Sequence, residues 1–175
     1  MRQVDVWRLR VDSGDDAHAL VRSVLASYVG AKPEALTFVH GLHGKPEIES
    51  AGRLRFNVSR SGSVGVLAVT WGRDVGVDVE QIDARRAVGP IADMLFDADE
   101  AAELRSLPEA RRVRRFFELW TRKEAYAKAL GVGLSVPLER LRPPRGWSLV
   151  DLPLGSDHVG ALCVRGRRPR VRLLG

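Results

Sequence analysis

The chain has 175 residues, 45% of them apolar, which suits one large domain or two small halves and excludes a disordered chain. Its apolar runs are far shorter than the roughly 18 residues that a membrane-spanning helix needs, and its charged start lacks the apolar core of a secretory signal. The single cysteine, Cys163, excludes an internal disulfide and fits a reducing compartment. These features predict a soluble cytoplasmic protein with no membrane partner.

The net charge of +6 and the isoelectric point near 10.2 indicate an anionic partner. Nucleic acid, an acidic protein and a phosphorylated small molecule all satisfy this condition. Arginines cluster in RRVRR at 111–115 and RGRRPR at 165–170, where they equally fit a solvated face and a loop. No helix-turn-helix, zinc-finger or RNA-binding motif accompanies them, so we expect no nucleic-acid partner.

The first part of the chain predicts a strand, a helix and further short strands. Residues 4–11 alternate as a strand does, and 15–29 carry apolar residues at helical spacing, ended by Gly30. Short strands are expected near 35–40, 54–58 and 64–71, separated by segments rich in glycine, proline and serine.

The second part repeats this mixture of helices and strands. A strand is expected at 75–80, followed by helices near 88–95, 97–106 and 109–130, the last with Pro108 at its start and Gly131 at its end. The remaining strands are expected near 147–152, 158–165 and 169–173. Each half is thus predicted to be a helix-and-sheet unit.

The segment VGVDVEQI at 75–82 places valines on one face of its predicted strand and Asp78 and Glu80 on the other. Two such carboxylates lie about 6–7 Å apart along the strand, so that both can bind one hard cation. Alternatively, this face of the strand meets water and both charges are solvated.

The helix FFELWTRKEAYAKALGVGL at 116–134 carries a second candidate group. Trp120 and Glu124 fall on one side of it, with Lys123 and Lys128 flanking Glu124. Locally, an ordinary Glu124–Lys128 ion pair worth a few tenths of a kcal/mol and a core tryptophan explain the same pattern. The acidic strand upstream, together with loops bearing lysine and serine, favours a site that binds phosphates and a metal.

Five motifs in this order resemble the 4′-phosphopantetheinyl transferase superfamily, specifically its two-half, surfactin-synthetase-activator type. They are GKP at 44–46, FNVSRS at 56–61, GVDVE at 76–80, LFDADE at 95–100 and WTRKEAYAKALGVGL at 120–134. The resemblance covers roughly residues 15–140. It implies transfer of 4′-phosphopantetheine from coenzyme A to a serine of an acyl or peptidyl carrier protein, with release of 3′,5′-adenosine bisphosphate.

The resemblance also implies roles for individual residues. Asp78 and Glu80 would hold Mg²⁺, or Mn²⁺, against the pyrophosphate of coenzyme A. Glu124 would complete this metal site or take the proton of the carrier serine. Lys128 would offset charge on the phosphates. For Glu100 the sequence leaves open a helix-start role and a supporting role in the site.

The residues expected to bind coenzyme A are Lys45, Pro46, Ser59, Arg60, Lys123 and Lys128. The sequence departs from the family pattern in two places, one among these residues and one nearer the N-terminus. Arg60 replaces the usual histidine; it still binds phosphate but does not act as an acid or base. The stretch VDSGDDAHA at 11–19 is short and lacks the family's basic residues there, so Arg22, Arg53 or another arginine would have to replace them.

The fold implied by the resemblance is α+β, with two similar halves related by a pseudo-twofold axis and the active-site cleft between them. The halves would span 1–74 and 75–175, and the protein would be a monomer. A basic transferase suits the acidic surface of a carrier protein, with 83–96 and the arginines of 111–115 as its docking surface. The alternatives are a catalytically impaired coenzyme A or carrier-binding module and, less favoured, a Mg²⁺-dependent nucleic-acid-binding protein.

Overall fold

The structure is a computed structural model that describes residues 3–11, 14–41 and 43–175. Its first half contains β1 (Gln3–Arg10), α1 (Gly14–Val29), β2 (Phe38–His40), β3 (Pro46–Ile48), β4 (Leu54–Ser61) and β5 (Val64–Trp71). The second half contains β6 (Val75–Gln81), α2 (Val88–Leu95), α3 (Ala98–Ser106), α4 (Glu109–Leu130), β7 (Trp147–Leu152), β8 (His158–Arg165) and β9 (Arg170–Leu174). No helix in these described ranges is long and apolar enough to cross a membrane.

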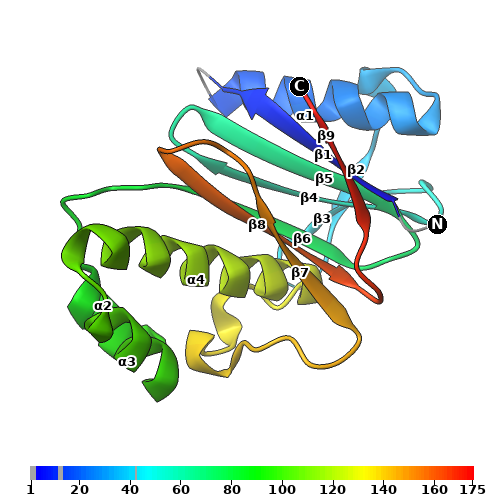
Figure 1. The fold of residues 1–175 in the computed structure, drawn as a ribbon. Coiled ribbons are helices and arrows are strands. Elements are labelled where there is room, and N and C mark those ends of the chain that lie inside the picture. The colour runs from blue at the N-terminus through cyan, green and yellow to red at the C-terminus, as the bar shows by residue number, and fades with distance from the viewer. Residues whose placement is uncertain (1–2, 12–13, 42) are drawn as a thin grey trace.

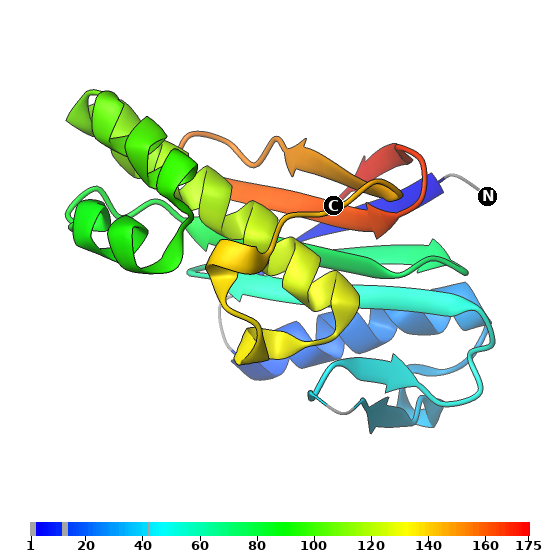
Figure 2. The same cartoon turned by 90° about the horizontal axis from the view of Figure 1, so that it is seen from below.

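Two sheets form the centre of the molecule (Figure 1). One has the strand order β4-β5-β1-β9 and the other β6-β8-β7, while β2 and β3 form a separate hairpin. A shared core of valines, leucines and an alanine from β1, β5, β6, β8 and the end of β7 joins the two sheets. Helix α1 packs on the outer face of the first sheet, and α4 on the outer face of the second. Figure 2 shows α4 from below, lying across the strands.

The α+β class and most of the expected elements are confirmed. The hairpin strand β3 was not expected, because Pro46 and the glycines before it are typical of a loop. The last strand, β9, pairs in parallel with β1, with Gln3 opposite Arg170 and Trp7 opposite Leu174. The end of the chain thus joins the sheet of the first half. The boundary near residue 74, the pseudo-twofold axis and the cleft stay predictions.

Strand β6 has the two unlike faces that its alternation predicted. Val75, Val77 and Val79 are buried in the core between the sheets. The opposite face carries Gly76, Asp78 and Glu80, and there β6 meets α4, whose packed residues Ala125 and Ala129 are small. The carboxylates of β6 therefore lie beside a helix.

Gly76 is what allows α4 to lie so close to β6. A Cβ atom built on it would be 2.1 Å from the carbonyl oxygen of Ala125 and 2.3 Å from the nitrogen of Ala129. Both contacts are to helix backbone, which cannot move aside as a flexible side chain can. The helix ends at Gly131, whose left-handed conformation (φ 70°) suits glycine and whose amide bonds to the carbonyls of Ala127 and Lys128.

Candidate active site

Four charged side chains from β6 and α4 meet where the strand and helix pack together. Asp78 is 3% exposed, and its Oδ1 lies 2.5 Å from the Nζ of Lys128. Both groups bond to the hydroxyl of Ser59, which donates to Asp78 at 2.7 Å and accepts from Lys128 at 2.9 Å. Glu80 and Glu124 are half-buried beside this pair. We call Asp78, Glu80, Glu124 and Lys128 the acidic cluster.

The side chains of β4 join this cluster to the first half. Asn57, Ser59 and Ser61 alternate along one side of β4. Asn57 accepts the backbone N–H of Val77 at 2.8 Å, Ser59 donates to Asp78, and Ser61 donates to Glu80 at 2.8 Å. We call this row of three β4 side chains the seam. It explains the FNVSRS motif, because each of its polar inward residues has a partner on β6.

Burial raises the pKa of all three carboxyl groups in the cluster, and like charge adds to this for Glu80 and Glu124. For Asp78, burial is the main cause and outweighs the lysine and serine contacts that lower its pKa. For Glu80, burial again comes first, opposed by Ser61 and reinforced by the charge of Asp78. For Glu124, burial and then the charge of Asp78 raise the pKa. The cluster therefore favours a bound proton or a cation.

The chemistry of these oxygens suits a divalent cation. Asp78 Oδ2 and Glu124 Oε1 are buried and have no hydrogen-bond partner, which is costly unless something else satisfies them. Carboxylate oxygens are the ligands that Mg²⁺ and Mn²⁺ prefer. Within the described residues, however, no group of three His, Cys, Asp or Glu side chains is close enough to hold a metal by itself. The oxygen donors suit Mg²⁺ in kind, and ligands from a substrate would be needed to complete such a site.

The GKP motif reaches the same two elements from the other end of β6. Lys45 donates to the carbonyl oxygens of Val75, at 2.9 Å, and Ala129, at 3.4 Å. Burial lowers the pKa of its ammonium, against the opposing charges of Asp74 and Glu47. A cavity of about 190 Å³ lies here, lined by residues of both predicted halves that include Lys45, Pro46, Arg55, Asp74 and Gly131.

Two predicted coenzyme A ligands lie apart from the acidic cluster. Arg60 is exposed on β4, because it alternates with the inward Ser59 and Ser61. Lys123 is 3% exposed and points elsewhere from α4: its Nζ lies 2.9 Å from Glu100 and donates to the carbonyl of Leu138 at 3.0 Å. Glu100 also accepts the N–H of Asp97 in the capping box that starts α3, which confirms its helix-start role.

Arg22, named as a replacement for the missing basic residues, borders a second cavity. The cavity measures about 310 Å³ and is lined by His18, Val21, Arg22, Phe38, His40, Pro46, Phe56 and Val58. One guanidinium nitrogen of Arg22 donates to the carbonyls of Pro33 and Leu36, and the group lies over the ring of Phe38. Residues 12 and 13 of the short upstream stretch lie outside the described residues.

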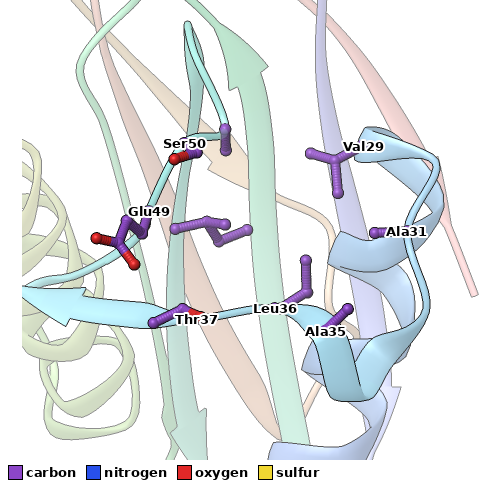
Figure 3. Close-up of a pocket in the computed structure, with 9 residues that line it drawn as sticks. Val29, Ala31, Ala35, Leu36, Thr37, Glu49 and Ser50 are labelled. Carbon is purple, nitrogen blue, oxygen red and sulfur yellow. The ribbon is translucent and has the colours of Figure 1, made fainter.

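A third cavity, of about 350 Å³, lies away from these motifs (Figure 3). It is lined by the end of α1, the turn at Pro33–Ala35 and the segment after β3, including Val29, Leu36, Thr37, Glu49 and Ser50. None of the predicted site residues lines it, so we assign it no role.

Sequence reasoning missed three residues that shape the cluster. Asn57 and Ser61 stood in a quoted motif, and their spacing from Ser59 along a strand could have identified them as one row. Gly76 stood in GVDVE, where a glycine inside a strand indicates close approach of another backbone.

The comparisons with known proteins agree with the motifs. The model of the 4′-phosphopantetheinyl transferase superfamily matches residues 74–164. The chain is 32% identical over 161 residues to 4′-phosphopantetheinyl transferase HetI of Nostoc sp., covering 84% of this chain and 68% of the relative. It is 31% identical over 153 residues to a 4′-phosphopantetheinyl transferase of Bacillus subtilis, covering 82% of this chain and 66% of the relative.

A putative 4′-phosphopantetheinyl transferase of Synechocystis sp. is 34% identical over 155 residues, covering 79% of this chain and 63% of the relative. The chain thus spans about two thirds of the length of each of these relatives. The extent of the family match and the coverage of HetI confirm the enzyme class that the five motifs predicted. The chain therefore belongs to the 4′-phosphopantetheinyl transferase superfamily.

Proposed function

We propose that this protein transfers 4′-phosphopantetheine from coenzyme A to a serine of an acyl or peptidyl carrier protein. The observation that carries the proposal is the acidic cluster, in which three carboxyl groups with raised pKa surround one lysine. Buried carboxylates that repel one another suit a site built for a cation and a proton transfer. The names of the relatives support the same reaction class.

In this reaction, the serine oxygen attacks the β-phosphorus of the coenzyme A pyrophosphate. A new P–O bond forms to the serine, the bond to the adenosine bisphosphate breaks, and the serine proton must leave. Glu124 is proposed to accept that proton, directly or through a water, because its raised pKa suits a general base. Lys128, partly exposed beside Asp78, offsets negative charge on the phosphates.

Mg²⁺ held by Asp78, Glu80 and Glu124 would neutralise charge on the pyrophosphate. Coenzyme A is proposed to contact the GKP segment through Lys45 and Pro46. Both border the cavity of about 190 Å³, and Pro46 also borders that of about 310 Å³. Ser59 is proposed to contribute to coenzyme A binding through its hydrogen bond with Lys128. Arg60, exposed on β4, is proposed to bind a phosphate of coenzyme A. Lys123 supports the fold of α3 and α4 instead of binding the cofactor.

The carrier protein is proposed to dock beside α4. A hollow of about 510 Å³ lies between the segment after β6 and the start of α4, lined by Ile82, Ala84, Glu109, Ala110, Val113 and Arg114. Arg85, 93% exposed, is near the same segment, and Met94 on α2 is 70% exposed. An apolar hollow with arginines around it suits an acidic helix of a carrier.

The arginines of 111–115 contribute less to this surface than expected. Arg112 donates to the carbonyl of Leu107, and Arg115 bonds to Glu103 at 2.6 Å. Arg114 contacts Glu118 and the carbonyl of Ser156 but stays 45% exposed. Arg111 is exposed as well, but Arg114 is the member of this group that lines the hollow, so we propose Arg114 for carrier docking, in a monomeric, cytoplasmic enzyme.

The test is intact mass spectrometry of several carrier proteins after incubation with this protein, coenzyme A and Mg²⁺. We expect each accepted carrier to gain one phosphopantetheine, and EDTA to abolish the gain. Asp78→Ala should remove the activity, whereas Glu34→Gln, a change at an exposed carboxylate outside the cluster and outside the docking segments, should retain it. Unchanged activity in Asp78→Ala would refute the proposed site.

A second measurement separates the enzyme from a binding module. Coenzyme A should raise the melting temperature of the protein in both cases, by mass action on the folded state. A raised melting temperature without modification of any carrier would support the impaired module and contradict the proposed activity.

A further inference from the structure

The hydroxyl of Ser61 makes two hydrogen bonds at the end of β4. It accepts the backbone N–H of Gln81 at 3.0 Å and donates to Glu80 Oε2 at 2.8 Å. A hydroxyl has a single proton, and the N–H of Gln81 cannot accept one. The hydroxyl proton of Ser61 therefore points to Glu80. Ser61 lies on strand β4 and Glu80 on strand β6, so the backbones of two strands position the two groups.

These bonds stand where a neighbouring strand would otherwise pair with β6. On its other side β6 pairs with β8 in a regular antiparallel register. On the β4 side, the N–H of Val77 bonds to Asn57 and that of Gln81 to Ser61. On this edge of β6, these backbone N–H groups are therefore hydrogen-bonded to side chains of β4 and not to backbone carbonyls.

The members of the seam differ in what they hold. The side chain of Asn57 accepts a hydrogen bond from the backbone of β6. Ser59 bonds to Asp78, a carboxylate that Lys128 also holds. Glu80 has no ion pair among the described residues, so Ser61 is the side chain that bonds to it directly. Because Oε2 of Glu80 accepts from the serine, Oε1 is the oxygen that keeps both of its lone pairs for a ligand.

We propose that Ser61 is a positioning residue, which orients the carboxylate of Glu80 toward a divalent cation in the acidic cluster. This inference rests on the proposed function, because it assumes a cation at the cluster. Hydrogen-bond partners of metal ligands typically affect metal affinity by about 10- to 100-fold. The effect of Ser61 should lie near the lower figure, since Asp78 and Glu124 do not depend on it.

The test is Mn²⁺ binding, measured by electron paramagnetic resonance at pH 8 with coenzyme A present and corrected for Mn²⁺ bound to free coenzyme A. Ser61→Ala should weaken Mn²⁺ binding about tenfold. Ser61→Thr retains the hydroxyl and should restore most of the affinity. Ser148→Ala on β7 is the matched control, because it removes a hydroxyl that donates to the carbonyl of Gly166, outside the cluster.

Urea unfolding of the same variants separates orientation from loss of structure. Ser61→Ala and Ser148→Ala should lose comparable stability, while only Ser61→Ala should lose Mn²⁺ affinity. Wild-type affinity in folded Ser61→Ala would overturn the inference, as would equal loss in Ser148→Ala or no Mn²⁺ binding by the wild type. A wild type that binds Mn²⁺ but modifies no carrier would instead contradict the proposed function and leave this inference standing.

Discussion

The ammonium of Lys128 lies 2.5 Å from Oδ1 of Asp78, so the cluster already contains one cation of its own. The lysine side chain is 29% exposed, whereas that of Asp78 is 4% exposed. Lys128 can therefore move toward solvent while Asp78 cannot. A divalent cation that approaches Asp78 meets the repulsion of this ammonium, and a substrate phosphate that attracts Lys128 would relieve it.

We predict that Lys128→Met binds Mn²⁺ more tightly than the wild type when no coenzyme A is present, by about tenfold. The measurement is a Mn²⁺ titration at pH 8, because removal of the lysine raises the pKa of Asp78 and protons would compete at lower pH. Lys32→Met, which removes an exposed lysine, is the control and should leave the affinity unchanged. Weaker binding by Lys128→Met would show that the lysine does not compete with metal.

The charge of Glu124 is predicted to lower the stability of the folded protein. Burial and the charge of Asp78 raise its pKa above the ordinary value of 4.5, and a carboxyl with a raised pKa destabilises the fold as the pH rises through that pKa. Glu124→Gln removes the charge, so it should increase the free energy of unfolding at pH 7 by roughly 0.5–2 kcal/mol while abolishing carrier modification.

The gain in Glu124→Gln should shrink as the pH falls toward 4.5, where the wild-type carboxyl is also protonated. Urea unfolding of both proteins across this pH range measures it. A gain that does not change with pH would mean that packing, and not charge, explains the difference.

The sequence predicted the elements of this fold well because its periodic patterns are strong. The alternation over 75–80 correctly placed the valines on one face of the strand and the carboxylates on the other, and Gly131 correctly ended α4. Parallel pairing of β9 with β1 joins residues separated by most of the chain, and no local pattern carries that information. The hairpin strand β3 is short, and its proline obscured it.

Within the site, the sequence alone did not show that Lys128 contacts Asp78 while Lys123 points elsewhere. Both flank Glu124 and both are lysines, but a helix advances about 100° per residue, so they leave it on different sides. Which of them meets Asp78 depends on how α4 is rotated against β6, and the buried contacts of Lys123 with Glu100 and Leu138 show that rotation.

Gly76 is predicted to hold α4 in place by having no side chain. In Gly76→Ala the new Cβ would lie 2.1 Å from the carbonyl oxygen of Ala125, so the helix must move away from β6. We expect a loss of about 3 kcal/mol in the free energy of unfolding, and lower activity, because Glu124 and Lys128 move with the helix.

The matched control is Gly89→Ala in α2, where no atom lies within 4 Å of the added carbon. Alanine should there stabilise the protein by about 0.4–1 kcal/mol, in contrast to the loss at Gly76. Urea unfolding and the carrier-modification assay measure both changes. Wild-type stability and activity in Gly76→Ala would contradict the close packing of β6 and α4.

Asp5 ties the last strand to the first and should make the fold sensitive to acid. Burial would raise its pKa, but hydrogen bonds from Arg172, Tyr28 and Gln3 outweigh burial and lower it below 3.8. A lowered carboxyl pKa adds stability above the unfolded value, and that stability is lost as the pH falls through the folded value. Asp5→Asn should therefore lose about 2 kcal/mol at pH 7.

This loss should disappear in strong acid, because protonation removes the charge of Asp5 from the wild type as well. Urea unfolding at pH 7 and below pH 3.8 tests the difference. The control is Asp99→Asn, whose side chain is 93% exposed and whose replacement should change stability by less than about 0.5 kcal/mol. If Asp5→Asn loses as much stability in acid as at neutral pH, its shape and not its charge holds β9 against β1.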